Sequence, residues 1–299
     1  MKKTIVTLVA LCAAIAVNAT VLRVSNVSGS TAPYSTIEDA LAAAAEGDTI
    51  MLDASAKDYG KIKIDKRIAL IGPGYWLQEN GIIQEGGGRS WFDNTITVEA
   101  SGVILQGLYI AYNVVVKKNC TDVVIKRCCI KNGGIVLESG ADRCVIHQNW
   151  IRDKIGEGGS YLQITNNIIW DYADLITIQG AKNSYVAYNT FLGKKDGVRF
   201  WDCDNSTVEK NIGVQFRDTG TSCSILDNMT YSNPIEAGSL IDSDVQALNL
   251  STTHGAFAGD SPYVISGVPS APVIEDLVVP TTVEYGTKMN VTIKVSVQK

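Results

Sequence analysis

Three aspartates recur at a fixed interval in the second half of the chain. Each lies seven residues after an asparagine of a repeated phrase, and they follow one another at equal spacing, as Asp174, Asp196 and Asp218. If this interval is one turn of a stacked structure, the three carboxylates form a row along its axis. Neighbouring carboxylates repel unless a cation or a basic side chain compensates, so the row predicts a Ca2+ site. The alternative interpretation is that each aspartate begins a turn, as Asp196 before Gly197 indicates, and bonds its own backbone.

Basic and aromatic residues lie close to these aspartates in the sequence. A polysaccharide lyase needs a base beside an ion that acidifies the proton next to a uronate carboxylate, and Lys195 or Arg199 could act as that base. Sugar-binding sites commonly combine aromatic faces with polar groups. The residues that we expect to contact a glycan near the aspartates are Trp170, Tyr172, Trp201 and Arg217.

A glycine-rich loop at residues 152–159 is a second candidate patch. It interrupts the regular spacing, and its candidate ligand-binding residues are Arg152 and Lys154. Loops that protrude from a rigid scaffold often carry function, although such a loop can also be a tolerated insertion. We expect it to lie on the same edge as the aspartates.

Other catalytic sets are missing from the sequence. Beyond residue 19 there are only two histidines, His147 and His254, and we interpret His147 as a strand residue rather than a base. We find no Ser-His-Asp or Cys-His set, no phosphate-binding loop and no zinc-ligand spacing. The leading hypothesis is therefore a non-catalytic protein that interacts with a carbohydrate. The alternatives are a lyase acting on a uronic-acid glycan and a structural or adhesive surface protein.

The repeated phrase predicts the architecture that positions these residues. It consists of an aliphatic residue, two mixed positions, an asparagine, one further residue and usually an apolar one. Its asparagines follow one another at similar intervals, as Asn149, Asn167, Asn189, Asn211 and Asn228. A unit of roughly 20 residues with short β-branched strands cannot bury its apolar face alone, so copies must stack. An asparagine at one place per turn can bond its counterparts about 4.8 Å above and below. We therefore predict an all-β protein, a right-handed parallel β-helix.

The two ends of the repeat region look different from its middle. A capping box at residues 35–38 predicts an alanine-rich helix over residues 39–46, which would cover the first turn of the solenoid. Short strands follow at residues 48–52, 62–64 and 68–71. After about residue 231 the repeat fades. Residues 273–299 alternate in polarity and predict one or two strands that cap the far end or pack along the side.

The N-terminus is typical of an exported protein. Two lysines, an apolar stretch and a small-residue cleavage site predict a signal peptide at residues 1–19. The predicted domains are then a β-helix with its N-terminal cap at residues 20–269 and a C-terminal β extension at residues 270–299. We expect a location in the periplasm, at the cell surface or outside the cell. No later stretch is apolar and long enough to span a membrane.

The net charge restricts the kinds of partner that we expect, and the cysteine content bears on disulfide formation. Without the signal peptide, 24 basic residues stand against 31 acidic residues, a net charge of −7, which argues against nucleic acid. We expect a monomer whose partner is a polysaccharide or another envelope component. Six cysteines remain, at positions 120, 128, 129, 144, 203 and 223. They can form one or two disulfides or serve as small buried hydrophobic residues, and the sequence leaves both open.

Several segments resemble a known superfamily. Residues 36–41, 47–50 and 68–72 look like the opening of pectin-lyase-like β-helix proteins, and the asparagine-containing turns resemble their later turns. The variant Ile71-Gly72-Pro73-Gly74-Tyr75 is most similar to secreted β-helix proteins of the Bacteroidetes without an assigned activity. The resemblance implies the fold, but it implies no single chemistry, because the superfamily includes lyases, hydrolases, esterases and non-catalytic adhesins.

Overall fold

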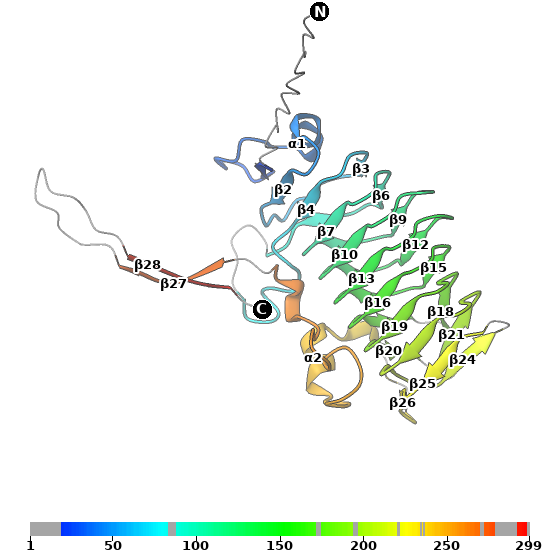
Figure 1. The fold of residues 1–299 in the computed structure, drawn as a ribbon. Helices are drawn as coiled ribbons and strands as arrows, with labels where there is room; N and C mark the ends of the chain where they lie inside the picture. The colour runs from blue at the N-terminus through cyan, green and yellow to red at the C-terminus, as the bar shows by residue number, and fades with distance from the viewer. Residues whose placement is uncertain are drawn as a thin grey trace, which may run out of the picture.

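The chain folds into a parallel β-solenoid whose three sheets run along its length (Figure 1). This computed structural model describes residues 19–82, 88–171, 175–193, 197–219, 222–233, 235 and 237–269, and the two strands at 272–278 and 292–297. Each strand pairs in parallel with the equivalent strand of the turn before and the turn after. The predicted all-β parallel β-helix is therefore confirmed.

Sheet A has ten strands: β1 (Val21–Val24), β2 (Thr49–Leu52), β4 (Ala69–Ile71), β7 (Ile104–Gln106), β10 (Val124–Lys126), β13 (Val145–His147), β16 (Gln163–Thr165), β19 (Tyr185–Ala187), β22 (Thr207–Glu209) and β25 (Ser224–Leu226). Sheet B has eight: β5 (Trp91–Phe92), β8 (Tyr109–Ile110), β11 (Cys129–Ile130), β14 (Trp150–Ile151), β17 (Ile168–Trp170), β20 (Thr190–Leu192), β23 (Ile212–Gly213) and β26 (Met229–Thr230). Sheet C also has eight: β3 (Ile62–Ile64), β6 (Ile96–Val98), β9 (Val114–Val116), β12 (Ile135–Leu137), β15 (Ile155–Glu157), β18 (Leu175–Gln179), β21 (Gly197–Trp201) and β24 (Phe216–Thr219).

The core fills the interior of the solenoid with stacked aliphatic residues. In sheet A the central residue of each strand points inward, and seven of these residues, buried and in register, are Leu70, Leu105, Ile125, Ile146, Ile164, Val186 and Val208. Burying such a side chain contributes about 1.5–3 kcal/mol. The flanking residues of the same strands point outward, which is why each strand shows a period of two.

The asparagine ladder joins sheets A and B, as the spacing predicts. The side-chain oxygen of Asn167 accepts bonds from the backbone and amide nitrogens of Asn149 at 2.9 and 3.0 Å, and the pattern repeats down to Asn228. The residue before each ladder position has a positive φ, including Gln148 at 57° and Tyr188 at 55°. This left-handed conformation turns the chain from one sheet to the next.

The N-terminal end is capped by α1 (Ile37–Ala43), whose N-cap is Thr36. The helix therefore starts and ends a few residues earlier than predicted. Its cap hydrogen bond runs from the backbone nitrogen of Asp39 to the Thr36 hydroxyl at 3.2 Å. Ile37 and Ala40 are buried against the first turn of the solenoid.

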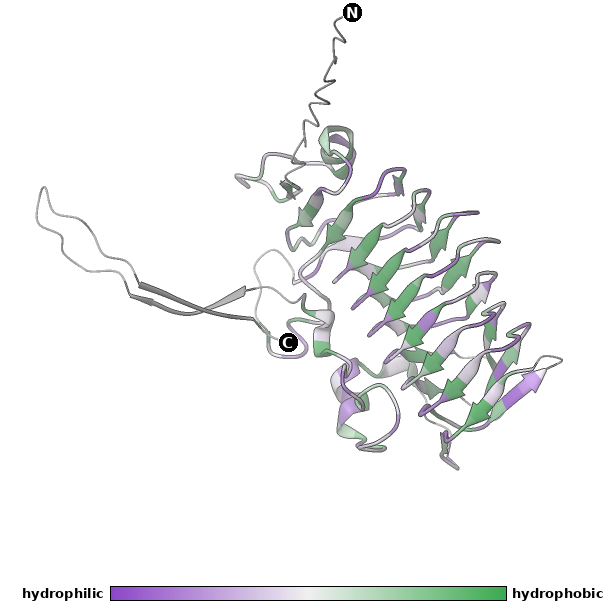
Figure 2. Ribbon diagram, in the orientation of Figure 1, coloured by the Kyte–Doolittle hydropathy of each residue, from purple (hydrophilic) through white to green (hydrophobic). Residues whose placement is uncertain are grey.

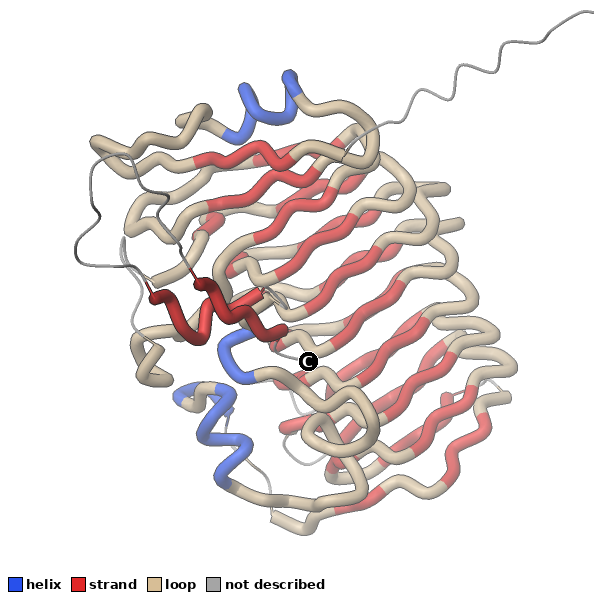
Figure 3. Tube along the Cα trace, turned by 60° about the vertical axis from the view of Figure 1, so that its left-hand side comes forward, coloured by secondary structure: helices blue, strands red, loops and turns tan. Residues whose placement is uncertain are grey.

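Residues 237–269, here called the strap, run back along the outer face of sheet B (Figure 3). The strap contains η2 (Ala237–Ser239), α2 (Asp242–Ala247) and η3 (Ile265–Gly267). Its apolar residues Ala237, Val245, Ala256 and Tyr263 join a second core with aromatic residues of sheet B. The buried Asp242 carboxylate accepts bonds from the Ser266 backbone at 2.6 Å and the Asn80 amide at 2.8 Å.

The C-terminal segment forms an antiparallel hairpin of β27 (Pro272–Val278) and β28 (Thr292–Val297) with an irregularity between Ile274 and Asp276. The hairpin extends away from the solenoid (Figure 1). The strap, not this segment, packs along the side. At the far end of the solenoid, β24 is coloured hydrophilic, and its last three residues are exposed (Figure 2).

Candidate functional site

The outer face of sheet C, near the far end of the solenoid, brings two arginines and a tryptophan together. Arg199 on β21 is in register with Thr177 on β18 and with Arg217 on β24. The Arg199 guanidinium lies over the Trp201 ring, with 5.2 Å between its central carbon and the ring centroid. Trp201 is 47% exposed and is in register with Gln179. We call Thr177, Gln179, Arg199, Trp201 and Arg217 the sheet C face.

Strand alternation explains why these side chains share one face. In β21, Val198 and Phe200 are completely buried, so the residues on either side of them point outward. Gly197 begins the strand with φ of +75°, and an added Cβ would lie 2.4 Å from the Gln215 backbone oxygen. Only glycine fits this close approach at the start of β21.

The two arginines form a cationic pair across neighbouring strands. An anion that contacts both guanidinium groups would interact favourably with the positive charge on each of them. Arg199 Nη2 donates to the Thr177 hydroxyl at 3.4 Å, whereas the buried Arg199 Nε has no hydrogen-bond partner in the described part of the chain. The face therefore combines positive charge and an exposed aromatic surface.

The structure places part of the predicted site here. Of the candidate catalytic residues, Arg199 lies on this face, together with the candidate ligand-binding residues Trp201 and Arg217. Three residues of this prediction, Asp174, Lys195 and Asp196, fall outside the described residues. Tyr172 falls outside them as well.

Asp218 lies in β24, beside Arg217. It is in register with the inward-facing Phe200, yet it is exposed, because β24 is the last strand of its sheet. Its carboxylate accepts a bond from the Cys223 backbone nitrogen at 3.4 Å. The described ranges contain no group of three or more histidine, cysteine, aspartate or glutamate residues able to hold a metal ion. The predicted Ca2+ row stays a prediction.

The other predicted ligand-binding residues lie elsewhere. Trp170 is only 2% exposed and belongs to the second core on sheet B, apart from Trp201 on sheet C. The Arg152 guanidinium stacks over Trp170 at 5.5 Å. Lys154 forms an ion pair with Glu157 at 2.8 Å. Arg152 thus packs on sheet B, whereas Lys154 pairs with the end of β15 in sheet C. The predicted loop at residues 152–159 contains this strand, whose Gly156 is in register with Gln179 of the sheet C face.

Sequence reasoning missed Thr177 and Gln179 on the sheet C face. They precede Arg199 and Trp201 by the same interval that aligns the aspartates. Counting one turn back from each predicted site residue would have found both. Their hydroxyl and amide groups add hydrogen-bonding capacity beside the arginines.

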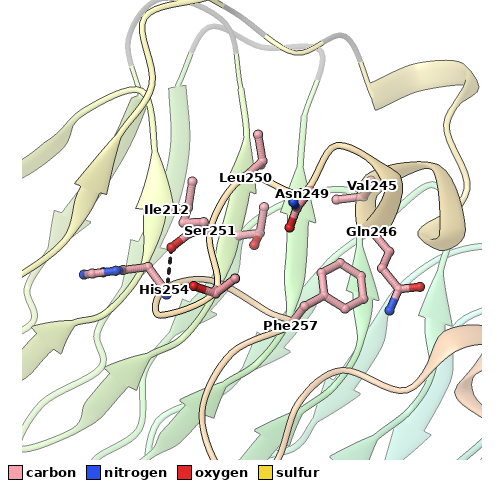
Figure 4. Close-up of a pocket in the computed structure, with 10 residues that line it drawn as sticks. Ile212, Val245, Gln246, Asn249, Leu250, Ser251, His254 and Phe257 are labelled. Atoms are coloured by element: carbon pink, nitrogen blue, oxygen red, sulfur yellow. Dashed lines mark hydrogen bonds between the residues drawn. The ribbon is translucent and has the colours of Figure 1, made fainter.

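A separate cavity lies between the strap and the last turns of sheet B (Figure 4). Its volume is about 270 Å³, and its lining includes Gln246, Asn249, Phe257 and His254. The His254 imidazole is already bonded, to Asp227 at 3.2 Å and to the Thr253 hydroxyl at 2.8 Å. The cavity is smaller than the roughly 300–1,000 Å³ of typical ligand pockets. None of the residues predicted from the sequence lines it.

The six cysteines are free thiols, and all but Cys223 are buried. Burial raises the pKa of Cys128 and of Cys203 to about 12, and that of Cys144 to about 11. Thiols with such pKa values stay protonated at neutral pH, so they are poor nucleophiles and poor metal ligands. Their positions fit the interpretation of small buried hydrophobic residues.

Comparisons with known proteins place the chain in a family. No curated protein and no solved structure matches it. The family described as "Periplasmic copper-binding protein (NosD)" matches residues 41–246, about two thirds of the chain and most of the solenoid. A periplasmic family agrees with the predicted export, and no described helix is long and apolar enough to cross a membrane. The chain belongs to the NosD family of periplasmic β-helix proteins.

Proposed function

We propose that this exported protein binds an acidic glycan through the sheet C face. The observation that carries the proposal is the Arg199 guanidinium stacked over the exposed Trp201 and in register with Arg217. A guanidinium binds a carboxylate or sulfate through two parallel hydrogen bonds. An exposed indole offers an apolar surface against which a sugar ring can stack.

Copper binding, which the family description names, does not follow from the described residues. A Cu(I) or Cu(II) site draws on thiolate, thioether and imidazole ligands. Here the buried thiols are protonated, and both imidazoles are occupied by hydrogen bonds, His147 with Thr165 and His254 with Asp227. The described residues contain no group of three or more histidine, cysteine, aspartate or glutamate residues that could hold a metal ion. We therefore base the function on the sheet C face and not on a metal.

A polysaccharide lyase is the second candidate, and one observation favours it. Arg199 Nε is buried without a hydrogen-bond partner in the described part of the chain. The rest of the Arg199 side chain is partly exposed beside the Trp201 ring, where its guanidinium could meet a uronate ring at its acidic proton. Lys195, which lies two residues before β21 in the sequence, is the alternative base. Binding and cleavage would use the same face, so the same polymers and variants can test both.

The test uses residues 20–299 and a panel of polymers. Polygalacturonate, alginate, a sulfated glycan and a neutral glucan are cast into native gels, and the protein's retardation is compared. We expect retardation by at least one acidic polymer and none by the glucan, and we expect Trp201→Ala and Arg199→Ala to abolish it. Arg143→Ala is the matched control, because Arg143 is an exposed arginine that lies just before β13 of sheet A and is paired with Asp122 at 2.7 Å.

The same polymers are incubated in solution with Ca2+ or with a chelator. Growth of ultraviolet absorbance from unsaturated sugar ends, lost in Arg199→Ala, would establish the lyase. A flat trace together with retardation would leave binding alone. Equal mobility of the wild type in every gel would refute the proposed function.

A further inference from the structure

A serine of the strap contacts the one histidine of sheet A. His147 lies on the outer face of β13, and its Nε2 is 3.1 Å from the Ser261 hydroxyl. Its Nδ1 is 2.8 Å from the Thr165 hydroxyl and 3.2 Å from the Thr165 backbone oxygen. The serine and the histidine are 114 residues apart in the sequence. Because of this separation, the sequence alone shows no Ser-His set. His147 is a strand residue, as predicted.

The contact is held by the backbone around it. Gln148, the left-handed residue after His147, donates from its amide to the backbone oxygens of Ser261, at 3.2 Å, and of Pro262. One turn further on, the Asn166 amide donates to the strap at the Ala256 and Ala258 backbone oxygens, at 3.1 and 2.9 Å. These bonds fix the position of residue 261 independently of its own side chain. The serine hydroxyl is thus positioned and still exposed.

The hydrogen bonds define the roles of the two imidazole nitrogens. With a proton on Nδ1 directed to the Thr165 oxygens, Nε2 accepts the Ser261 O–H proton. Burial lowers the pKa of His147 to about 4 against the opposing effect of its hydrogen bond to Thr165, and the positive charges of Arg127 and Lys126 lower it further, so the ring is neutral at pH 7. A neutral base bonded to a hydroxyl and oriented by a third group is the arrangement of an activated serine nucleophile.

A cation lies next to this pair. Lys126 on β10 is in register with His147, one strand spacing away, about 4.8 Å along the sheet. The positive charges of Lys126 and of the following Arg127 act on the His147 imidazole. Positive charge near a reacting carbonyl stabilises the oxyanion of a tetrahedral intermediate.

We propose that Ser261 and His147 form an acyl-transfer site that hydrolyses carboxylic esters. The Ser261 oxygen attacks the ester carbonyl carbon while its proton passes to His147 Nε2. The carbon–oxygen bond to the alcohol breaks, and the alcohol leaves with the proton from His147. Water then attacks the acyl-serine, again giving a proton to His147, and releases the carboxylic acid and the free serine. Water is the only co-reactant, and no oxidant or metal is required.

This site is independent of the proposed glycan-binding face. It lies on sheet A and the strap, whereas Arg199, Trp201 and Arg217 lie on sheet C. We expect variants of Ser261 or His147 to lose ester hydrolysis and to keep glycan binding through the sheet C face. The two proposals can therefore fail separately.

The test is an esterase assay with covalent trapping on residues 20–299. We expect the wild type to hydrolyse p-nitrophenyl acetate and to take up one fluorophosphonate, found by mass spectrometry on the peptide containing Ser261. Ser261→Ala should remove the labelling. Ser261→Ala and His147→Ala should each lower the hydrolysis rate roughly 100-fold, within the range expected for a nucleophile and its base. Ser243→Ala and His254→Ala are the matched controls and should react like the wild type.

A structural role for the contact predicts a different pattern. If Ser261 only fastens the strap, Ser261→Ala should lower the urea midpoint and leave the background rate of ester hydrolysis unchanged. Three results would each overturn the proposal. They are labelling at another residue, no labelling at all, and a wild-type hydrolysis rate no higher than that of Ser261→Ala. Circular dichroism on every variant separates loss of chemistry from loss of fold.

Discussion

Removing one asparagine from the middle of the ladder should cost much of the stability of the solenoid. The Asn189 side-chain oxygen accepts bonds from the backbone and amide nitrogens of Asn167, at 3.0 and 2.9 Å. Its amide nitrogen donates to the Ile164 backbone oxygen at 2.8 Å and to the Asn211 side-chain oxygen at 3.0 Å. Asn189 and both neighbouring asparagines are completely buried, so water does not replace these bonds.

The magnitude follows from the groups that Asn189→Ala leaves without partners. The Asn167 backbone N–H loses its acceptor, and an Asn167 amide hydrogen and the Ile164 oxygen lose a partner each. A buried polar group without a partner costs about 1–3 kcal/mol. Allowing for local relaxation, we expect the free energy of unfolding to fall by about 3–5 kcal/mol.

Urea denaturation followed by tryptophan fluorescence and circular dichroism measures this loss. The control is Asn228→Ala at the far end of the same ladder, where Asn228 is half-buried and its bonds to Asn211 lie near solvent. Water can satisfy the groups exposed there, so we expect a loss of about 1 kcal/mol. Equal midpoints for the two variants, or a loss below about 1 kcal/mol for Asn189→Ala, would refute the view that buried ladder bonds hold sheets A and B together.

Three further predictions concern single positions. Gly156→Ala would place a Cβ 1.9 Å from a backbone oxygen of β18, so we expect the urea midpoint to fall by the equivalent of at least about 2 kcal/mol. Hydrogen bonds from Arg143 hold the pKa of Asp122 at about 2 instead of 3.8, so this ion pair contributes stability above pH 4 and loses it as the pH falls toward 2. Because the pair is exposed, Asp122→Asn should cost less than about 1 kcal/mol in urea unfolding at pH 7 and only a small part of that at pH 2. An aromatic disulfide reagent should modify Cys223 first in the native protein and Cys128 only on unfolding, as peptide mapping would show.

The sequence predicted the solenoid because its local signals agree with one another. The asparagine spacing, the short aliphatic strands and the helix before the first turn all belong to one architecture. The ladder asparagines have a single structural role, and the hydrogen bonds between them are the ones that the spacing predicts. The register within each sheet then follows from the same intervals.

The arrangement of functional residues was less predictable. Arg199 and Arg217 are in register only because the turn between them is shorter than the turn before it, a difference that the equal aspartate spacing does not reveal. Trp170 looked like a surface residue near Trp201, but the returning strap covers it. A sequence pattern does not show which face a non-repetitive segment covers, since that depends on contacts distant in the chain.

The contact between Ser261 and His147 shows the same limit. Nothing within either local sequence marks the pair, because the two residues meet only where the strap returns to sheet A. The fixing bonds come from Gln148, whose left-handed conformation at a turn is itself part of the repeat. The repeat thus predicts the solenoid, whereas the contacts of the non-repetitive strap determine which residues meet on its surface.

Calorimetric titration of an acidic oligosaccharide into the protein tests the proposed function most directly. The ligand is a uronate oligomer of the polymer that retards the protein in gels, titrated into the wild type, Trp201→Ala, Arg217→Ala and the control Arg143→Ala. We predict saturable binding that weakens at least tenfold in Trp201→Ala and in Arg217→Ala, about 1.4 kcal/mol each, and that is unchanged in Arg143→Ala. Binding of the same strength in all four proteins would contradict the assignment of the sheet C face as the glycan site.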